Sequence, residues 1–202
     1  MTASETSSPR DRLLETAGAL FQRHGFQAVG IDRILAESGV AKMTLYRHFA
    51  SKDELIAAYL ERADTQFWSW ANTAMEKAGT PRAKLIAFFD AVGDLASTPE
   101  CLGCVFQGAA MAFPEIEHPG HQIAVRHKLA VRKRLTELAR EARLTHPDAL
   151  GAQLALLLDG AWIAARTFRR TENSAKSVTQ AAKTLIEAHT PPPTQRRSPK
   201  SR

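Results

Sequence analysis

The stretch "GVAKMTLYRHFASKDEL", residues 39–55, carries the clearest structural signal in this chain of 202 residues. It contains three Lys or Arg, a histidine and a tyrosine, and no acidic residue precedes Asp53. At 100° per residue, a helix from about residue 42 to 48 places Leu45 and Phe49 on one side. The opposite side then carries Lys42, Met43, Tyr46 and Arg47. The pattern predicts a short helix with one buried face and one exposed cationic face.

Turn and capping signals place this helix in a larger unit. A first helix is expected to begin after Ser8 and to end at Gly25, and a second spans 31–38 between Gly30 and Gly39. A fourth is expected to begin after Ser51, with Glu54 completing a capping box, and to continue to about residue 77. Two short helices joined at a glycine turn and supported by a longer one form a helix-turn-helix.

The exposed face of the third helix has the chemistry that a major-groove helix requires. Long cationic and polar side chains reach base edges and phosphates, and a small hydroxyl fits where the backbones come close. A lysine beside the start of the fourth helix adds a phosphate donor near a helix N-terminus. The predicted DNA-binding residues are Lys42, Thr44, Tyr46, Arg47, His48 and Lys52. The alternative, a solvated face of a short core helix, remains open on composition alone.

The spelling of residues 21–55, "FQRHGFQAVGIDRILAESGVAKMTLYRHFASKDEL", resembles the DNA-binding domain of the TetR family of bacterial transcriptional regulators. The resemblance rests on "HGF" at the end of the first helix, on the second helix up to Val40, and on "TLYRHF.SKDEL". It implies that Thr44 contacts a phosphate or a thymine methyl, and that Tyr46, His48 and Lys52 hold phosphates. Arg47 and Lys42 would approach base edges or phosphates. Gly30 and Ala41 stand where the family usually has hydroxyl-bearing caps, so DNA binding is expected to depend strongly on salt.

Helical periodicity continues through the rest of the chain, with helices expected at about 81–96, 103–112, 120–143, 147–170 and 174–189. The predicted fold is therefore all-α, with about nine helices and a helix-turn-helix domain at the N-terminus. The expected organisation is a flexible N-terminus (1–8), a DNA-binding domain (9–55), an effector-binding and dimerisation domain (56–189) and a disordered tail (190–202). The tail contains four Lys or Arg and no acid.

The helix predicted over 147–170 is apolar almost all round, which requires that it be covered on more than one side. A second copy of the chain is the expected cover on one side. The resemblance implies that the last two helices form a four-helix bundle across a two-fold axis, and hence that the DNA operator is pseudo-palindromic. The predicted dimer-interface residues are Leu154, Leu158, Val178 and Leu185.

Aromatic residues gather in the middle of the chain and are interrupted by isolated polar groups. Plain packing explains any single aromatic, but the set fits an apolar pocket with a few orienting groups. The resemblance also implies a small-molecule effector site there. Asp159 stands out, because a carboxylate in the apolar run "LLLDGAW" requires a partner or a changed pKa. The predicted ligand-binding residues are Trp70, Phe106, Gln107, Met111, His127, Asp159 and Trp162.

The pair Cys101 and Cys104 in "CLGC" offers an alternative, a redox- or metal-responsive regulator. Inert, buried cysteines are the simpler interpretation, and no histidine has a recognised zinc-ligand spacing with them. No metal site or cofactor is expected. Common catalytic motifs such as GxSxG, HExxH and GxxxxGK do not occur, so an enzyme is not expected either.

Composition agrees with a DNA-binding protein but does not by itself establish one. The net charge is +6 and the isoelectric point about 9.6, yet much of the excess lies in the tail. The polar N-terminus is not that of a secretory signal, and Asp159 interrupts the most apolar segment. We expect a cytoplasmic, homodimeric regulator outside the membrane. It binds a double-stranded DNA operator, acts as a repressor, and is released by a small molecule.

Overall fold

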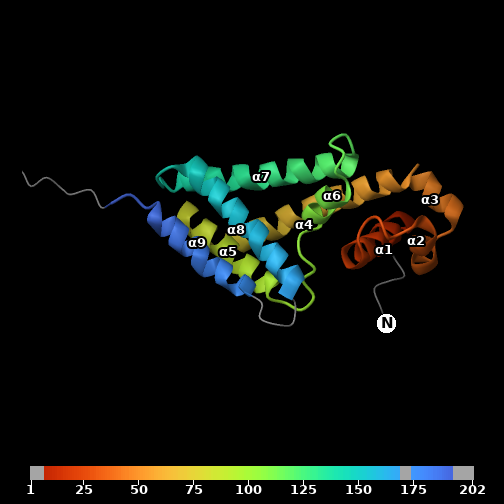
Figure 1. The fold of residues 1–202 in the computed structure, drawn as a ribbon, viewed down its shortest axis with the longest axis horizontal. Helices are drawn as coiled ribbons and strands as arrows, with labels where there is room; N and C mark the ends of the chain where they lie inside the picture. Colours follow the sequence, from red (N-terminus) through yellow and green to blue (C-terminus); the bar gives the residue numbers. More distant parts are fainter. Residues whose placement is uncertain (1–6, 169–173, 193–202) are drawn as a thin grey trace, which may run out of the picture.

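The computed structural model describes residues 7–168 and 174–192, which form α-helices, loops and one 3₁₀ turn, without a strand (Figure 1). The helices are α1 (Pro9–His24), α2 (Ile31–Ser38), α3 (Lys42–His48), α4 (Lys52–Glu76), α5 (Pro81–Ala96), α6 (Val105–Ala112), α7 (Pro119–Glu141), α8 (Pro147–Phe168) and α9 (Ser177–Ala188). The predicted all-α fold is confirmed. The structure does not describe most of the predicted N-terminal segment (1–8) and of the predicted tail (190–202). It also leaves out residues 169 and 170, the last two of the helix predicted over 147–170.

The first three helices begin and end where the sequence signals place them. The Ser8 side chain accepts a hydrogen bond from the Asp11 backbone N–H at 3.1 Å and caps α1. Gly39 ends α2 with φ 65°, a left-handed conformation that glycine adopts without a steric penalty. The resulting turn sets α3 against α1, with Leu45 completely buried below it.

Two hydrophobic cores meet along α4, which runs from one end of the molecule into the other (Figure 1). Leu55, Ile56 and Leu60 belong to the core of the N-terminal helices, whereas Ala71 and Met75 belong to the C-terminal core. The boundary expected after residue 55 therefore falls inside one continuous helix. The N-terminal core also takes in side chains from α6 and from the start of α7, which follow much later in the sequence.

The joint between α1 and α4 is closely packed. Tyr59 lies directly against Gly18, where an added Cβ would stand 2.5 Å from the tyrosine ring. The Gln22 amide donates a hydrogen bond to the Tyr59 hydroxyl at 3.0 Å, and burial raises the pKa of Tyr59 to about 12. Further along α4, Arg62 pairs with Asp11 and Glu15. These contacts fix the direction of α4 relative to the N-terminal helices.

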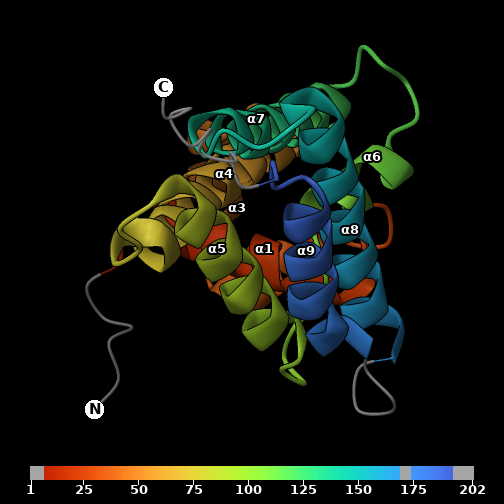
Figure 2. The same ribbon diagram turned by 90° about the vertical axis from the view of Figure 1, so that its left-hand side faces the viewer.

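Helices α5, α7, α8 and α9 form the C-terminal body together with the end of α4 (Figure 2). Helix α8 is long and apolar enough to cross a membrane by length and composition alone, a property that core helices share. It packs against α5, α7 and α9. Its outer side is open: Leu156 is 73% exposed and Ile163 is 47% exposed.

Smaller differences from the sequence-based boundaries occur at helix ends in this body. Helix α6 begins at Val105 rather than residue 103, because Gly103 adopts φ 80° in the preceding segment. Helix α9 begins at Ser177, after the 3₁₀ turn Ser174–Lys176.

Candidate functional site

Helix α3 presents a polar, cationic surface at one end of the molecule (Figure 1). Lys42, Tyr46, Arg47 and His48 are exposed and Thr44 is partly exposed, whereas Leu45 and Phe49 are buried, as the helical pattern predicts. Within the described residues, Arg47 has no ion-pair partner. Its guanidinium group is therefore available to an anion outside the chain.

Both of the predicted DNA-binding lysines, Lys42 and Lys52, have a partner within the chain. The Lys42 ammonium group lies 3.8 Å from the Asp32 carboxylate, but both side chains are mostly exposed, so this pair is weak. The Lys52 ammonium group donates to the Phe26 carbonyl oxygen at 2.8 Å, and partial burial lowers its pKa. Lys52 thus joins the start of α4 to the end of α1 and keeps two further donors for a phosphate.

The N-termini of α2 and α3 have no side-chain cap. Gly30 and Ala41 occupy the N-cap positions of α2 and α3, and neither offers a hydroxyl. By contrast, α4 is capped by Ser51, which accepts from the Glu54 N–H at 3.1 Å, while the Glu54 carboxylate accepts from the Ala50 N–H. The first-turn amides of α2 and α3 are thus left for solvent or another acceptor.

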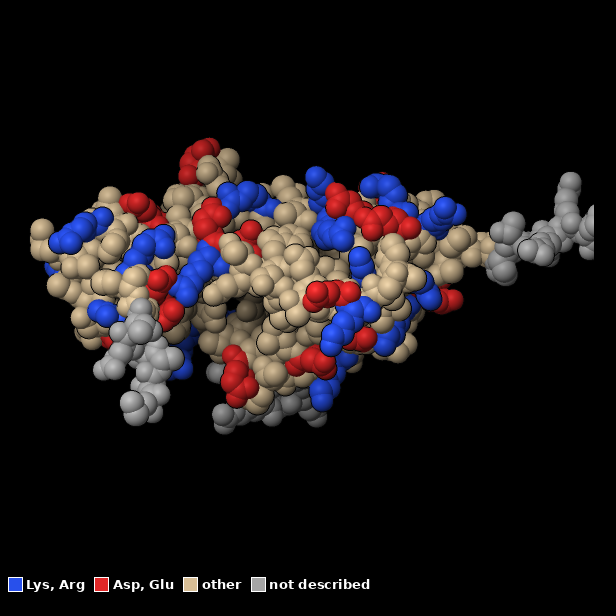
Figure 3. All heavy atoms as spheres, turned by 180° about the vertical axis from the view of Figure 1, so that it is seen from behind, with Lys and Arg blue, Asp and Glu red and all other residues tan. Residues whose placement is uncertain are grey.

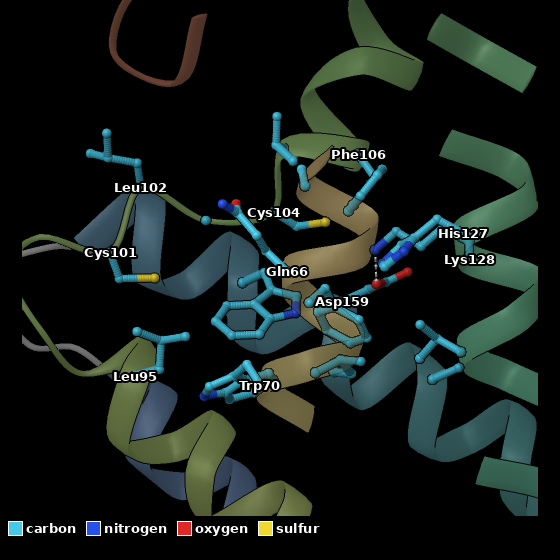
Figure 4. Close-up of a pocket in the computed structure, with 18 of the residues that line it drawn as sticks. Gln66, Trp70, Leu95, Cys101, Leu102, Cys104, Phe106, His127, Lys128 and Asp159 are labelled. Atoms are coloured by element: carbon cyan, nitrogen blue, oxygen red, sulfur yellow. Dashed lines mark hydrogen bonds and ion pairs between the residues drawn. The ribbon is translucent and has the colours of Figure 1, made fainter. Parts of the chain in front are cut away.

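A cavity of about 640 Å³ lies within the C-terminal body, near the end of the N-terminal helices (Figure 4). Its walls come from α4, the segment after α5, and α6, α7 and α8. The molecule is visibly hollowed between the N-terminal helices and the body on the face in Figure 3. Five of the predicted ligand-binding residues line this cavity: Trp70, Phe106, His127, Asp159 and Trp162.

His127 is enclosed by aromatic rings and a carboxylate. Its ring stacks on Phe106 with centroids 3.6 Å apart and meets Phe67 edge-on at 4.7 Å. Its Nδ1 lies 2.6 Å from Asp64 Oδ1. Burial lowers the pKa of His127, and the hydrogen bond to Asp64 opposes this shift only in part. The imidazole is thus held in one orientation and is neutral at pH 7.

Asp159 has a partner that the sequence did not suggest. Its carboxylate accepts a hydrogen bond from the Lys128 ammonium group at 2.5 Å, an ion pair across the cavity wall (Figure 4). The expectation that Asp159 is buried needs correction, because its side chain is 37% exposed. Lys128 supplies the opposite charge.

Gln107 and Met111 were predicted to bind the same ligand, but neither lines the large cavity. Both line a second cavity of about 390 Å³ between α1, α6 and α8. The Gln107 amide donates to the Asp159 backbone carbonyl at 3.3 Å, and Met111 is 78% exposed. Both side chains leave α6 on the side of the second cavity, whose walls include Phe21, Phe26 and Trp162.

Residues 102–105 form a wall that the two cavities share. Arg166 of α8 fixes this wall, since its Nη1 donates to the Leu102 carbonyl at 2.9 Å and to the Gln22 carbonyl at 3.0 Å. Gly103 packs so closely that an added Cβ would stand 2.8 Å from the Trp162 carbonyl oxygen. One guanidinium group therefore joins the cavity wall to the last turns of α1.

Cys101 and Cys104 are free thiols, partly buried, and both line the large cavity (Figure 4). Burial raises the pKa of the Cys101 thiol. Within the described residues, no group of three or more His, Cys, Asp or Glu side chains is placed to hold a metal ion.

Sequence reasoning missed several residues of the cavity. Lys128 follows His127 directly, so its approach to Asp159 requires knowing how α7 crosses α8. Phe67 of α4 and Gln22 of α1 also line the cavity, and neither was among the predicted ligand-binding residues. A helical wheel of α4 would have placed Phe67 and Trp70 on one side, since they are three residues apart.

The predicted dimer-interface residues also need correction. Leu154, Leu158 and Val178 are each at most 3% exposed, and all belong to the core of their own protomer. An enclosed side chain does not contact a second copy without repacking, and only Leu185 is partly exposed. The exposed positions of α8 include instead Leu156, Gly160 and Ile163, spaced four and three residues apart.

Comparison with known proteins agrees with the fold and with the α3 surface. Residues 13–59 match the family model described as "Bacterial regulatory proteins, tetR family". The crystal structure of SCO4454, a TetR-family transcriptional regulator from Streptomyces coelicolor, superposes with a TM-score of 0.85 and 31% identity. That match covers 91% of this chain and 96% of SCO4454. The chain belongs to the TetR family of transcriptional regulators.

Two curated relatives of this TetR-family chain are similar over less than half of its length. The activator FasR of Mycolicibacterium smegmatis is 36% identical over 85 residues, which are 42% of this chain and 39% of FasR. The repressor SCO4008 of Streptomyces coelicolor is 39% identical over 62 residues, 31% of this chain and 32% of SCO4008. The matches thus span about a third of either relative, and the two names differ in the sign of regulation.

Proposed function

We propose that this TetR-family regulator is a homodimeric repressor that binds a pseudo-palindromic operator and is released when a small molecule occupies the large cavity. The observation that carries the proposal is the placement of two features that α1 connects, since α1 packs against α3 and is joined to the cavity wall through Arg166. The first is the cationic face of α3, on which Arg47 has no ion-pair partner within the described residues, and the second is the aromatic cavity that Gln22 of α1 helps to line.

The DNA-binding part of the proposal rests on the side chains of α3. Arg47 and Lys42 supply positive charge, while Tyr46 and His48 supply polar groups that reach phosphates. Thr44 lies between the exposed and buried sides, where a small side chain lets the backbones approach. Lys52 would contact a flanking phosphate without leaving the Phe26 carbonyl.

The dimer part rests on the outer side of α8. Leu156 and Ile163 are large, apolar and exposed where they border the large and the second cavity, respectively, and Gly160 between them has open space above it. A small residue between two apolar ones lets a second helix approach closely. We assign this face, continued by Leu185 of α9, to the contact with the second copy. A two-fold dimer then presents two α3 helices to two half-sites.

The release part rests on the shared wall. A ligand in the large cavity meets residues 102–105, which Arg166 ties to the Gln22 carbonyl of α1. A displacement of this wall favours a different position of the N-terminal helices, and the ligand shifts the population toward the form that holds it better. The spacing of the two α3 helices then no longer matches two half-sites.

Selection of bound sequences from a random pool of duplex DNA tests the proposal. The expected result is a pseudo-palindrome whose half-sites are separated by about one helical turn or a multiple of it. Enrichment of no sequence, or of a single asymmetric site by a monomer, would contradict it. Measuring transcription from a promoter that carries the selected site then decides between repression and activation.

A second candidate is a redox-responsive regulator, because Cys101 and Cys104 both line the cavity next to the shared wall. Oxidation of the pair by peroxide would change the wall directly. If the double variant Cys101→Ser, Cys104→Ser loses DNA release by peroxide, this candidate gains over the first. Unchanged release in that variant removes it.

A further inference from the structure

Among the described residues, His127 is the buried polar side chain that faces the large cavity. It is 4% exposed, yet only one of its two ring nitrogens has a hydrogen-bond partner in the described structure. Stacking on Phe106 and edge contact with Phe67 prevent the ring from turning to find a second partner. The remaining nitrogen, Nε2, is therefore a polar atom held in one position among aromatic rings.

The contact with Asp64 determines whether Nε2 donates or accepts a hydrogen bond. A carboxylate only accepts hydrogen bonds, so Nδ1, 2.6 Å from Asp64 Oδ1, carries the ring proton and donates it. Because burial keeps the imidazole neutral, Nε2 then has a lone pair and no hydrogen. Asp64 thus makes Nε2 a hydrogen-bond acceptor.

The other residues of the cavity wall indicate the chemistry of the rest of the ligand. Phe67, Trp70 and Trp162 form an aromatic cluster, with Trp70 6.4 Å from Trp162 and 5.7 Å from Phe67 between ring centroids. The charged side chains of the lining sum to zero, since Lys128 pairs with Asp159 and the exposed Glu100 and Arg132 are of opposite sign. Such walls favour flat, uncharged rings, and the cavity volume lies in the usual range for small-molecule sites.

We infer that the effector is an uncharged, ring-containing molecule with a hydroxyl group that donates a hydrogen bond to Nε2 of His127. The inference rests on the proposed function, since it names the ligand chemistry of the same cavity. A ligand of the same shape without that hydrogen leaves the buried acceptor unpaired, and a methyl ether sets one acceptor against another. The site is therefore selective for alcohols and phenols over their ethers.

Isothermal titration calorimetry with 2-naphthol and 2-methoxynaphthalene tests this on the full chain. The two probes share the ring system and differ in the donor hydrogen. We expect the native protein to bind 2-naphthol about tenfold more tightly, which corresponds to one buried hydrogen bond. His127→Phe keeps a stacking ring on Phe106 and is expected to bind both probes about equally.

Asp64→Asn is the sharper variant, because it leaves His127 in place and changes only its proton. The amide can donate to Nδ1, which moves the ring proton to Nε2 and turns the acceptor into a donor. The preference for 2-naphthol is expected to fall to about zero or to reverse. Asp90→Asn is the matched control, since Asp90 pairs with Lys183 outside the cavity and its loss should leave the preference unchanged.

Equal affinity of the native protein for both probes would overturn the inference and leave the cavity as a ligand site of other chemistry. Failure of both probes to bind would overturn it as well. A preference that persists unchanged in both His127→Phe and Asp64→Asn would show that the donor is recognised elsewhere. Operator selection uses no ligand, so its outcome judges the proposed function separately.

Discussion

The α3 surface and the large cavity differ in the charge that their side chains present. On α3, Arg47 has no ion-pair partner within the described residues, and Lys42 has only a distant, exposed one. In the cavity, Lys128 is paired with Asp159, and His127 is neutral beside Asp64. Unpaired cations on a surface favour a polyanion, whereas internally neutralised charges favour an uncharged ligand. The same chain thus selects two very different partners through a net positive charge at one site and a net charge of zero at the other.

The largest effect is expected when the open charges are removed. The double variant Tyr46→Ala, Arg47→Ala should weaken binding to the selected operator by about 2–6 kcal/mol at each half-site, because two contacts of about 1–3 kcal/mol each are lost there. Fluorescence anisotropy with labelled operator measures this. Lys77→Ala, an exposed cation at the far end of α4, is the control for net charge. Equal losses in both variants would assign the effect to net charge alone.

The next effect concerns the proposed dimer face, on which both sites depend. Gly160→Glu should produce monomers and greatly weaken operator binding, because a charged side chain would enter the contact between two α8 helices. The protomer itself should fold normally, since an added Cβ at Gly160 meets nothing within 4 Å and glutamate favours a helix.

Gly79→Glu is the matched control for this variant. It introduces the same side chain at another glycine with open surroundings, in the turn between α4 and α5. Analytical ultracentrifugation should find a dimer for this control and a monomer for Gly160→Glu. Dimers for both would place the contact on another face.

The connection between the two regions is expected to have a smaller effect on stability. Arg166→Ala removes the hydrogen bonds to the Leu102 and Gln22 carbonyls and should lower the free energy of unfolding by about 1–3 kcal/mol, since each bond contributes about 0.5–1.5 kcal/mol. Urea unfolding followed by far-UV circular dichroism also shows whether the two cores then unfold separately. Arg23→Ala, in the exposed last turn of α1, is the control. Equal changes in both variants would contradict a specific role for Arg166.

The smallest effect is expected from the titration of His127. Its pKa in the folded state is below the ordinary 6.5 because of burial, so the unfolded chain binds a proton that the folded chain does not. Stability is therefore fully present above about pH 6.5 and falls as the pH decreases below it. Melting temperatures at pH 7.5 and 5.5 should differ more for the native protein than for His127→Phe. An equal difference would assign the pH dependence to other groups.

The bounds of the N-terminal helices could be predicted from the sequence much more closely than the residues that line the cavity. Caps at Ser8 and Ser51 and turns at Gly25 and Gly39 are local signals, so the bounds of α1, α2 and α3 were predictable from neighbouring residues. The cavity depends on how distant helices cross. That crossing brings Lys128 to Asp159 and Asp64 to His127, and it turns Met111 outward. Helical periodicity shows that Leu154 is on an apolar face, but not whether its own protomer or a partner covers it.

The close approach of Tyr59 to Gly18 has an evolutionary consequence. Since an added Cβ at position 18 would stand 2.5 Å from the tyrosine ring, the two positions are not free to change independently. Among relatives with this joint, a larger residue at the position of Gly18 requires a smaller one at the position of Tyr59. The hydrogen bond from Gln22 extends the linkage to a third position. These three positions should covary as a group, although Tyr59 is separated from the other two by most of the helix-turn-helix.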